Sequence, residues 1–462
     1  MLGWKRIIVI GAASAAVVAC GSAASDGAGF ADDSNDPRDA GAAPPPRSAD
    51  AGNDARAAQD AGGRDAATAT DASATDASAN DASAYDAAPY DASTNDGSAS
   101  DAGDSLAIVS SHRIGTGWWS TCAVREAGAL YCWGYNGYGA VGDGTQTDRH
   151  TPVLVSGLDP VAQVAVGAYS ACALSTKGTV SCWGSGAYGE MGDGVARSTP
   201  ALLPVAVAGL TNVVELSAGA HHFCVRKSDD SLWCWGFSAH GEVGDGVFAD
   251  VRPVGKIMDD VAQVSADTYN TCAAMKDGTA KCWGENVNGT DGTGTSDTPY
   301  DTPQTVSGLS GVVRVGTGTL QACALLADGT VKCWGDNAFG EIGDNTTDER
   351  LTPVSVQNLI DVAQIVPGGP GAGYLIATCA LGKNGAVSCW GANGYGELGN
   401  GGTTSSLVPT AASITNVIEL AVGGGHACAE RNDGSLWCWG YDAYGEIGDG
   451  ATTNELSPVR IF

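Results

Sequence analysis

Seven pairs of cysteines, each separated by ten residues, constrain the fold of this chain more than any other feature. In every pair the second cysteine opens the tripeptide Cys-Trp-Gly. Self-similarity at a period of about 50 residues predicts a repeat architecture, and the cysteines set its register. The pairs are Cys122 with Cys132, Cys172 with Cys182, Cys224 with Cys234, Cys272 with Cys282, Cys323 with Cys333, Cys379 with Cys389, and Cys428 with Cys438.

The cysteine spacing is typical of a β-hairpin. Between Cys272 and Cys282, a three-residue loop with Gly278 in the left-handed conformation places the two cysteines directly opposite each other. At a non-hydrogen-bonded position their Cα atoms lie about 4.5 Å apart, within the range of a disulfide. We therefore expect seven disulfides, one inside each hairpin. The alternative is zinc held by four thiolates from neighbouring repeats, but structural zinc sites favour spacers of two to four residues.

Short β-rich runs bounded by Gly and Asp turns fill each repeat, and helical periodicity is absent from the sequence after residue 106. Cys172 and Leu174 share one face of their strand, whereas Trp183 points to the other side, so both faces of the hairpin are apolar. Such a sheet packs between two similar sheets. Seven repeats then predict an all-β, seven-bladed β-propeller over residues 106–462.

The end of the chain suggests how the ring closes. Each repeat ends in a Pro-Val strand, as at Pro152-Val153, which we expect to be handed to the next unit. The last such strand, Pro458–Phe462, should then return to the blade that contains Cys122 and Cys132.

Residues 1–20 have the pattern of an export signal. A short basic stretch precedes about 13 apolar residues, too few to span a bilayer comfortably. The run Val17-Val18-Ala19-Cys20 resembles the lipobox of bacterial lipoproteins, so we expect Cys20 to be lipidated and to anchor an exported protein in a membrane. An ordinary signal peptide cut nearby is the alternative. Gly21 is not the Asp that retains lipoproteins at the inner membrane, which favours the outer membrane or cell surface.

Residues 21–105 have the composition of a tether. They contain 17 Asp, no Glu and four Arg, with almost no aliphatic or aromatic side chains. So little apolar surface cannot offset the entropy of ordering the backbone, and we expect a disordered linker. A calcium-binding or glycosylated stalk is the alternative, because Ser and Thr are frequent.

The repeats resemble those of the regulator of chromosome condensation family. The resemblance rests on stretches such as Cys333-Trp-Gly-Asp-Asn-Ala-Phe-Gly-Glu-Ile-Gly343 and Cys389-Trp-Gly-Ala-Asn-Gly-Tyr-Gly-Glu-Leu-Gly399. It recurs in register over residues 107–462 and implies a seven-bladed propeller that serves as a protein-binding platform. The family's Gln is Glu in five repeats here, and the fourth repeat, Gly284–Gly294, lacks the Gly-Glu-hydrophobic-Gly element.

Charge argues against two activities known in that family, nucleotide exchange on a small nuclear GTPase and chromatin binding. The region 106–462 carries 35 acidic and 17 basic residues, a formal charge of −18. Nucleic-acid binders need clustered Lys and Arg to displace counterions, so we expect no nucleic-acid partner. The export signal also places the protein outside the cytoplasm. We expect a monomeric propeller.

Side chains with catalytic potential form no recognisable constellation in the sequence, and we expect no catalytic residue, no cofactor and no metal. His221 and His426 stand where the repeat has its histidine, and a structural hydrogen bond is the favoured interpretation. The Asp residues of the Gly-Asp-Gly turns are interpreted as turn residues that bond their own backbone. They are Asp143, Asp193, Asp245 and Asp449.

Three functions remain open on the sequence. The leading one is a lipid-anchored, non-catalytic propeller that binds an exported or surface protein through its loop faces. Aromatic and apolar residues that do not recur in register are the candidate contact surface: Trp118, Trp119, Tyr374 and Leu375. The second is an extracellular hydrolase or lyase acting on polysaccharide or peptide, with acids such as Asp267, Asp291 and Asp297 near the channel. The third is a purely structural envelope component.

Overall fold

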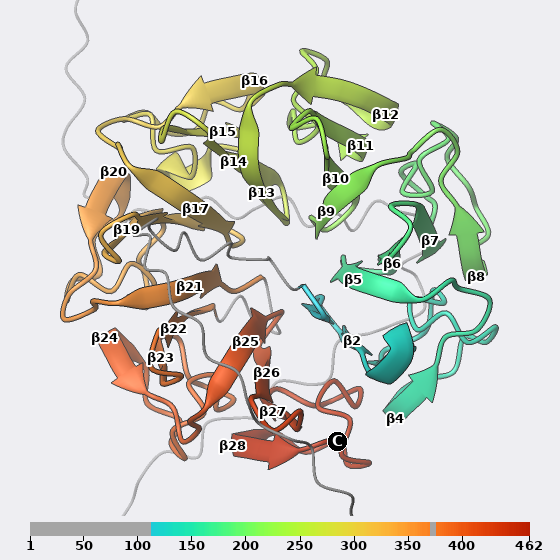
Figure 1. Cartoon of the computed structure of the whole chain (residues 1–462). Coiled ribbons are helices and arrows are strands. Elements are labelled where there is room, and N and C mark those ends of the chain that lie inside the picture. The colour runs from blue at the N-terminus through green and yellow to red at the C-terminus, as the bar shows by residue number, and fades with distance from the viewer. Residues whose placement is uncertain (1–111, 370–375) are drawn as a thin grey trace, which may run out of the picture. The chain divides into compact units, whose positions relative to one another are not determined.

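The computed structural model describes residues 112–369 and 376–462 of the 462-residue chain. Its strands form seven four-stranded antiparallel sheets set around a common axis, as the blades of a propeller (Figure 1). Each blade is one sequence repeat, and consecutive strands of a repeat are neighbours in its sheet. The all-β, seven-bladed propeller expected from the cysteine register is confirmed.

Blades are numbered here in chain order. Blades 1 to 4 contain β1 (Ile114–Thr116), β2 (Ser120–Val124), β3 (Leu130–Gly134), β4 (Arg149–Leu154); β5 (Val161–Val166), β6 (Ser170–Ser175), β7 (Val180–Gly184), β8 (Ala201–Ala206); β9 (Val213–Ala218), β10 (His222–Lys227), β11 (Leu232–Ser238), β12 (Ala249–Met258); β13 (Val261–Asp267), β14 (Asn270–Met275), β15 (Ala280–Gly284) and β16 (Tyr300–Thr305).

Blades 5 to 7 contain β17 (Val312–Thr317), β18 (Gln321–Leu326), β19 (Val331–Gly335), β20 (Arg350–Ser355); β21 (Val362–Pro367), β22 (Ala377–Gly382), β23 (Val387–Gly391), β24 (Ser406–Ala411); β25 (Val417–Val422), β26 (His426–Arg431), β27 (Leu436–Gly440) and β28 (Glu455–Arg460). Two short 3-10 helices, η1 (Glu126–Gly128) and η2 (Val287–Gly289), lie in connections of blades 1 and 4.

The second and third strands of every blade form the cysteine hairpin. In blade 4, Cys272 pairs directly with Cys282, as the spacing predicted. The loop position is a glycine with positive φ in six repeats, for example Gly278 at 80°, and in the seventh it is Asp230 at 63°. Asp is one of the few residues that tolerates this conformation.

All seven expected disulfides are present, each within its own hairpin. Their Cα atoms lie 4.0 to 4.1 Å apart, slightly closer than the expected 4.5 Å of a non-hydrogen-bonded pair. The alternative of zinc shared between neighbouring repeats is wrong, because each of the fourteen repeat cysteines is bonded to the cysteine opposite it. The bonds join Cys122 to Cys132, Cys172 to Cys182, Cys224 to Cys234, Cys272 to Cys282, Cys323 to Cys333, Cys379 to Cys389, and Cys428 to Cys438.

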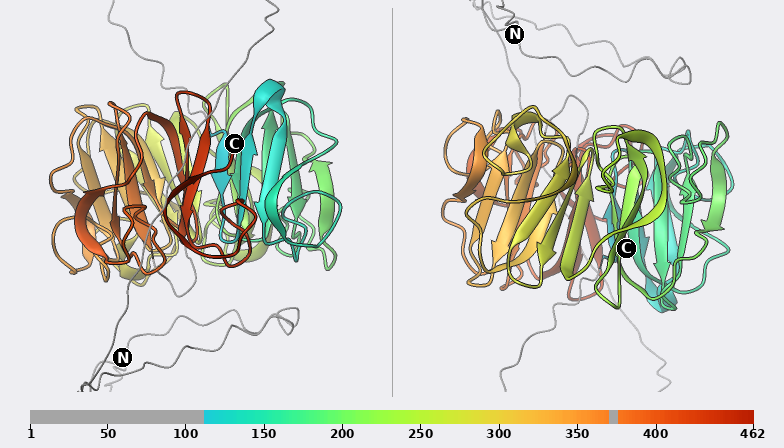
Figure 2. Two further views of the ribbon diagram at one scale, coloured as in Figure 1. Left: turned by 90° about the horizontal axis from the view of Figure 1, so that it is seen from below. Right: turned by 90° about the horizontal axis from the view of Figure 1, so that it is seen from above.

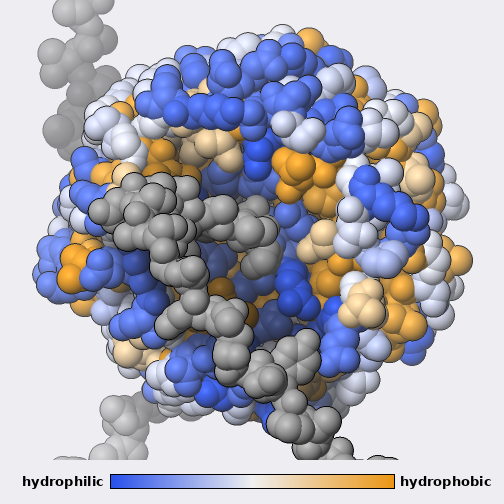
Figure 3. All heavy atoms as spheres, viewed as in Figure 1, coloured by the Kyte–Doolittle hydropathy of each residue, from blue (hydrophilic) through white to orange (hydrophobic). Residues whose placement is uncertain are grey.

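The connections gather at two ends of the ring because successive strands run in opposite directions. The hairpin end carries the cysteine loops and the connections between blades. The motif end carries the first-to-second and third-to-fourth connections of each blade, which contain the residues around Trp-Gly-x-Asn. Figure 2 shows the blades from the side, with connections at both ends. The face seen in Figure 3 is hollowed at its centre, where the inner strands surround a channel.

The tryptophan of each Cys-Trp-Gly lies between two blades and joins them. All seven side chains are completely buried, as expected of core residues. Each indole N–H also donates to a backbone carbonyl of the preceding blade, at 2.7 to 2.9 Å. The hydrophobic clusters pair adjacent blades in the same way: one includes Cys122 and Leu130 of blade 1 with Val164 and Trp183 of blade 2. Both faces of each inner hairpin are therefore buried.

A second contact runs in the opposite direction, along the innermost strands. A Gln or Glu at the third position of the strand accepts a hydrogen bond from the backbone of the following blade. Gln163 Oε1 accepts from Leu216 N at 3.1 Å, and Gln364 Oε1 from Leu420 N at 3.1 Å. Glu419 of blade 7 does the same toward blade 1, where its Oε1 accepts from Ile114 N at 3.1 Å.

The expected route of ring closure is wrong. The last strand, β28, pairs with β27 of its own repeat, with Val459 opposite Cys438. Every Pro-Val strand stays in its own blade as the fourth strand, because it pairs with the strand before it in sequence. Blades 7 and 1 are joined instead by Glu419, by the Trp133 indole bound to Glu446 O, and by Phe462, whose ring packs against Tyr131 and Trp133.

Candidate functional site

Aromatic side chains at the motif end form a continuous arc. Neighbouring ring centroids lie 4.7 to 6.4 Å apart. We call this arc the aromatic rim, and its members, in order around the ring, are Tyr395, Tyr441, Trp119, Tyr444, Tyr135, Tyr138, Tyr169, Trp118, His221, Tyr188, Phe237, His240 and Tyr269. The rim therefore crosses blades 6, 7, 1, 2, 3 and 4.

Every member of the rim except Trp118 comes from one of three recurring positions in the repeat. Tyr169 directly precedes the second strand of its blade, Tyr135 directly follows Trp-Gly, and Tyr138 lies three residues further on. Blade 5 places Leu320, Asp336 and Phe339 at these positions, so the arc is open there. All rim residues except the buried His221 are partly exposed.

Buried carboxyl groups fix the backbone beneath several of these rings. Glu190 Oε2 accepts a hydrogen bond from Tyr188 N at 2.8 Å, and Glu446 Oε2 accepts from Tyr444 N at 2.8 Å. Burial, reinforced by the charge of Asp442, raises the pKa of Glu446 to about 8. This carboxyl group therefore keeps its proton at neutral pH, which suits a position where the family repeat has Gln.

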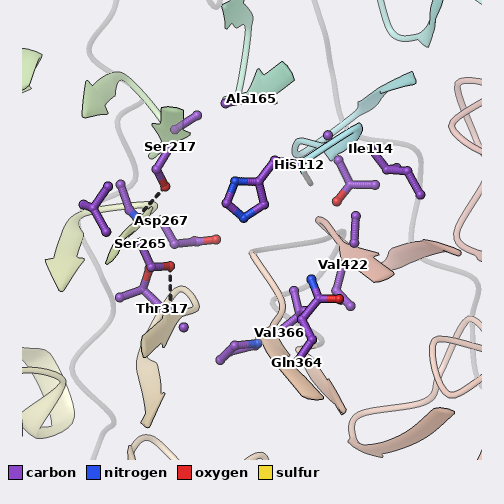
Figure 4. A pocket seen from close by; sticks show the side chains of 18 of the residues that line it. His112, Ile114, Ala165, Ser217, Ser265, Asp267, Thr317, Gln364, Val366 and Val422 are labelled. Atoms are coloured by element: carbon purple, nitrogen blue, oxygen red, sulfur yellow. Dashed lines mark hydrogen bonds between the residues drawn. The ribbon is translucent and has the colours of Figure 1, made fainter. Parts of the chain in front are cut away.

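The channel is lined by the inner strands of all seven blades and has a cavity volume of about 160 Å³. Burial lowers the pKa of the Arg314 guanidinium, whereas the charges of Glu215 and Glu419 raise it. Burial and Arg314 lower the pKa of His112 to about 4, so this imidazole is neutral at pH 7. Figure 4 shows His112 and Asp267 pointing into the channel.

The acids suggested for a hydrolase do not come together. Asp267 lines the channel, but Asp291 is fully buried within the interior and Asp297 is exposed in the β15–β16 connection. Burial raises the pKa of Asp291 well above its usual range. The three side chains thus form no paired-carboxylate site of the kind that glycosidases use.

One histidine assignment is wrong and one is consistent with the structure. His426 Nε2 makes a 2.8 Å hydrogen bond with Thr121 Oγ1 of the next blade. The equivalent residue in blade 3 is His222, two residues before Cys224, with Thr271 Oγ1 at 2.8 Å from its Nε2. His221 lies on the aromatic rim instead, because the adjacent histidine takes the buried, inward-facing position.

Three of the four Gly-Asp-Gly aspartates bond their own backbone, as interpreted, whereas Asp245 binds the Arg252 side chain and its Oδ1 accepts no hydrogen bond within the described residues. Asp449 Oδ1 accepts from Ala451 N at 2.8 Å, and Asp143 Oδ1 accepts from Thr145 N at 2.9 Å. Within the two described ranges, no group of three or more His, Cys, Asp or Glu side chains is placed to hold a metal ion. Nor does the described part of the chain contain a helix with the length and apolarity needed to cross a bilayer.

Of the predicted contact residues, Trp118 and Trp119 both lie on the aromatic rim. Tyr374, Leu375 and the lipidation candidate Cys20 lie outside the described residues, as do the expected signal and tether at 1–105. Sequence reasoning missed the rest of the rim. The signal was present, because an aromatic residue recurs in stretches such as Asn136-Gly-Tyr138-Gly139.

A ring of seven four-stranded blades with two loop-bearing ends defines this chain as a β-propeller. Two models of the "Regulator of chromosome condensation (RCC1) repeat" match it, one over residues 127–174, 177–225 and 384–429. The other matches residues 112–140, 161–190, 213–242, 312–341 and 417–446. The chain belongs to the regulator of chromosome condensation repeat family.

Curated relatives include much longer proteins. The chain is 32% identical over 326 residues to the human "Probable E3 ubiquitin-protein ligase HERC4", covering 68% of this chain and 26% of HERC4. It is 30% identical over 125 residues to the human "E3 ubiquitin-protein ligase HERC2", covering 25% of this chain and 2% of HERC2. The chain thus spans about a quarter or less of these relatives.

Solved structures share the fold. Human WBSCR16 superposes with a TM-score of 0.64 at 20% identity, covering 72% of this chain and 94% of that one. Yeast RCC1 (Prp20), in its complex with Kap60, gives a TM-score of 0.64 at 18% identity, covering 72% and 83%. At these identities the likeness establishes the propeller fold alone.

Proposed function

We propose that this chain is a lipid-anchored, non-catalytic propeller of the cell envelope that binds an exported or surface protein through its aromatic rim. The observation that carries the proposal is the rim itself. Tyr and Trp offer large, rigid contact area with a polar tip, and they are enriched at the centres of protein interfaces. RCC1-type propellers are, in addition, typically protein-binding or regulatory folds.

The rim has the properties of a preorganised contact surface. Tyr138 packs at 4.7 Å from Tyr169, and Trp118 contacts Tyr169 edge-on at 6.1 Å, so each ring is held by its neighbours. Holding the rings in place before binding reduces the entropy lost when a partner docks. The buried Glu190 and Glu446 carboxyls hold the backbone under these rings in the same way.

The proposed anchor rests on the sequence. Val17-Val18-Ala19-Cys20 has the lipobox pattern, and the fourteen other cysteines are all paired in the hairpins. A Cys20→Ser chain expressed in a bacterium that processes lipoproteins should lose incorporation of a labelled fatty acid and leave the membrane fraction. Unchanged labelling of that variant would refute the anchor.

The binding proposal is tested by capture followed by measured affinities. Exported and surface proteins retained by the purified chain are identified, and their affinity is measured for wild type, Trp118→Ala and Tyr138→Ala. We expect each substitution to weaken binding at least tenfold, as truncation of an aromatic hot-spot residue does.

The matched control is Ile360→Ala at the hairpin end, where the side chain is 72% exposed. Its affinity should equal that of wild type. The rim is not the binding surface if both rim variants bind the partners as tightly as wild type does and have the melting temperature of wild type.

A further inference from the structure

One residue breaks the repeat pattern at the narrow mouth of the channel. The innermost strand of six blades is followed, or ended, by a glycine: Gly117, Gly167, Gly219, Gly318, Gly368 and Gly423. These glycines are packed so closely that a Cβ on Gly117 would lie 2.2 Å from Gly167 O. In blade 4 the same position is Asp267. Blade 4 is therefore the one blade that places a carboxylate at this position.

Asp267 lies where two cavities meet. It lines the channel cavity of about 160 Å³ and also a smaller cavity of about 30 Å³ at the mouth. The smaller cavity is lined as well by Trp118, a member of the aromatic rim, and by Thr268. In Figure 4 the Asp267 carboxyl group points toward the middle of the channel. Asp267 and Trp118 thus line the same small cavity at the mouth.

Only one oxygen of this carboxyl group has its hydrogen-bonding needs met by the propeller. Oδ1 accepts from Thr268 N at 2.6 Å and from Thr268 Oγ1 at 2.7 Å. Within the described residues no hydrogen bond reaches Oδ2, and no basic side chain contributes to the pKa of Asp267. Burial raises this pKa to about 6, so the group is charged at neutral pH. A buried charge is costly unless a counter-charge accompanies it.

The charged groups nearby do not supply that counter-charge. His112 points into the same channel but is neutral, because its pKa is about 4. The charge of Arg314 interacts with Glu215 and Glu419, whose carboxylates raise its pKa. The channel itself leaves Asp267 as an uncompensated carboxylate.

The motif end around the mouth is also short of free cations. Among the residues that the structure describes, four arginines lie at this end, and each forms an ion pair with an aspartate of the same repeat: Arg149–Asp143, Arg197–Asp193, Arg252–Asp245 and Arg350–Asp344. Other acids at this end, such as Asp148 and Asp348, form no ion pair within the described ranges. A cationic group approaching this end therefore meets a favourable field.

We propose that the mouth of the channel is a socket for an ammonium or guanidinium group, held by Asp267 Oδ2 and the face of Trp118. The source is a Lys or Arg side chain of the protein that binds the aromatic rim, so the source, though not the socket, rests on the function proposed above. A carboxylate beside an indole is the combination that recognises organic cations, by charge and by cation–π attraction. A cavity of about 30 Å³ is larger than the roughly 10–15 Å³ that one water molecule needs, so it can admit an ammonium head.

The socket is tested on the full chain with n-butylammonium as the probe, by saturation-transfer NMR at pH 7.5. We expect saturable binding with a dissociation constant in the millimolar range, because the probe lacks the rest of the partner. In Asp267→Gly, which restores the residue found in the other six blades, the affinity should fall at least tenfold. Asp267→Asn serves as a second variant, and it should lose the same affinity.

Two controls make the result specific. Asp297→Asn removes an exposed acid of the same repeat and should leave binding unchanged. The uncharged probe n-butanol should not bind saturably. Equal binding by wild type and Asp267→Gly would overturn the socket and leave the rim untouched. A micromolar affinity for n-butylammonium alone would overturn the proposed source, since a free amine would then suffice as ligand.

Discussion

The seam between the last and first blades depends on the side chain of Glu419. Its Oε1 accepts hydrogen bonds from Arg113 N at 2.6 Å and from Ile114 N at 3.1 Å, and the Glu419 side chain is buried. The substitution Glu419→Ala would leave both N–H groups without an acceptor. An unsatisfied buried donor costs about 1–3 kcal/mol, and Arg113 N is partly accessible to water, so we expect a loss of about 2–4 kcal/mol.

The loss is measured by hydrogen exchange of the Ile114 amide. A loss of this size corresponds to exchange about 30- to 900-fold faster, because about 1.4 kcal/mol is a factor of ten. Glu419→Gln should exchange like wild type, because a glutamine oxygen accepts the equivalent bond at Gln163 and Gln364.

An interior joint provides the comparison. In Gln364→Ala the Leu420 amide loses its acceptor in the same way and should exchange faster by a similar factor. The reasoning is refuted if Ile114 in Glu419→Ala stays as protected as in wild type, since closure would then not depend on this side chain.

Three further perturbations test the packing of the ring. Gly448→Ala would place a Cβ 2.5 Å from Trp133 Nε1 at a φ of 87°, so it should destabilise the protein by more than Gly434→Ala, where a Cβ meets nothing within 4 Å; differential scanning calorimetry compares the two melting temperatures. The pKa of Glu446 is raised to about 8, so its stabilising contribution is fully present below about pH 4.5 and is lost as pH rises through 8. Denaturation from pH 5 to 9 should therefore show Glu446→Gln gaining about 2–4 kcal/mol over wild type at the alkaline end; a constant difference would contradict the assignment. Deleting residues 456–462 removes most of β28 from blade 7 and also the packing of the Phe462 ring against Trp133 of blade 1. Unchanged thermal stability would show that neither β28 nor this packing stabilises the propeller.

The blade could be predicted from sequence because its determinants are local. Nine residues between Cys272 and Cys282 suit a hairpin register that places the two cysteines opposite each other, and Gly278 supplies the turn it requires. The determinants of strand pairing between hairpin and fourth strand are less local. The strand at Pro458 has the same pattern whether it completes its own blade or the next one, so sequence alone could not choose between the two.

The candidate site was predictable only in part. Trp118 and Trp119 were identified because they were interpreted as non-recurring. Trp119 in fact shares its position with Tyr169, and most of the rim lies at recurring positions that the repeat itself concealed. The sequence analysis named Asp267 as an acid near the channel. That it replaces a glycine becomes clear only when its position is compared with Gly167 and the equivalent glycines of the other blades. His221 and His222 are adjacent, and only the strand register shows which of the two faces inward.

Every disulfide joins residues that are ten positions apart, so each thiol meets its partner by closing a short loop. Short loops close far more readily than long ones, which favours the native partner over twelve competing thiols of the propeller. Under oxidising conditions the disulfides can thus form hairpin by hairpin, before any blade has met its neighbour. Disulfide formation therefore does not depend on the association of the blades. A propeller with this many cysteines can reach its native disulfides without disulfide exchange.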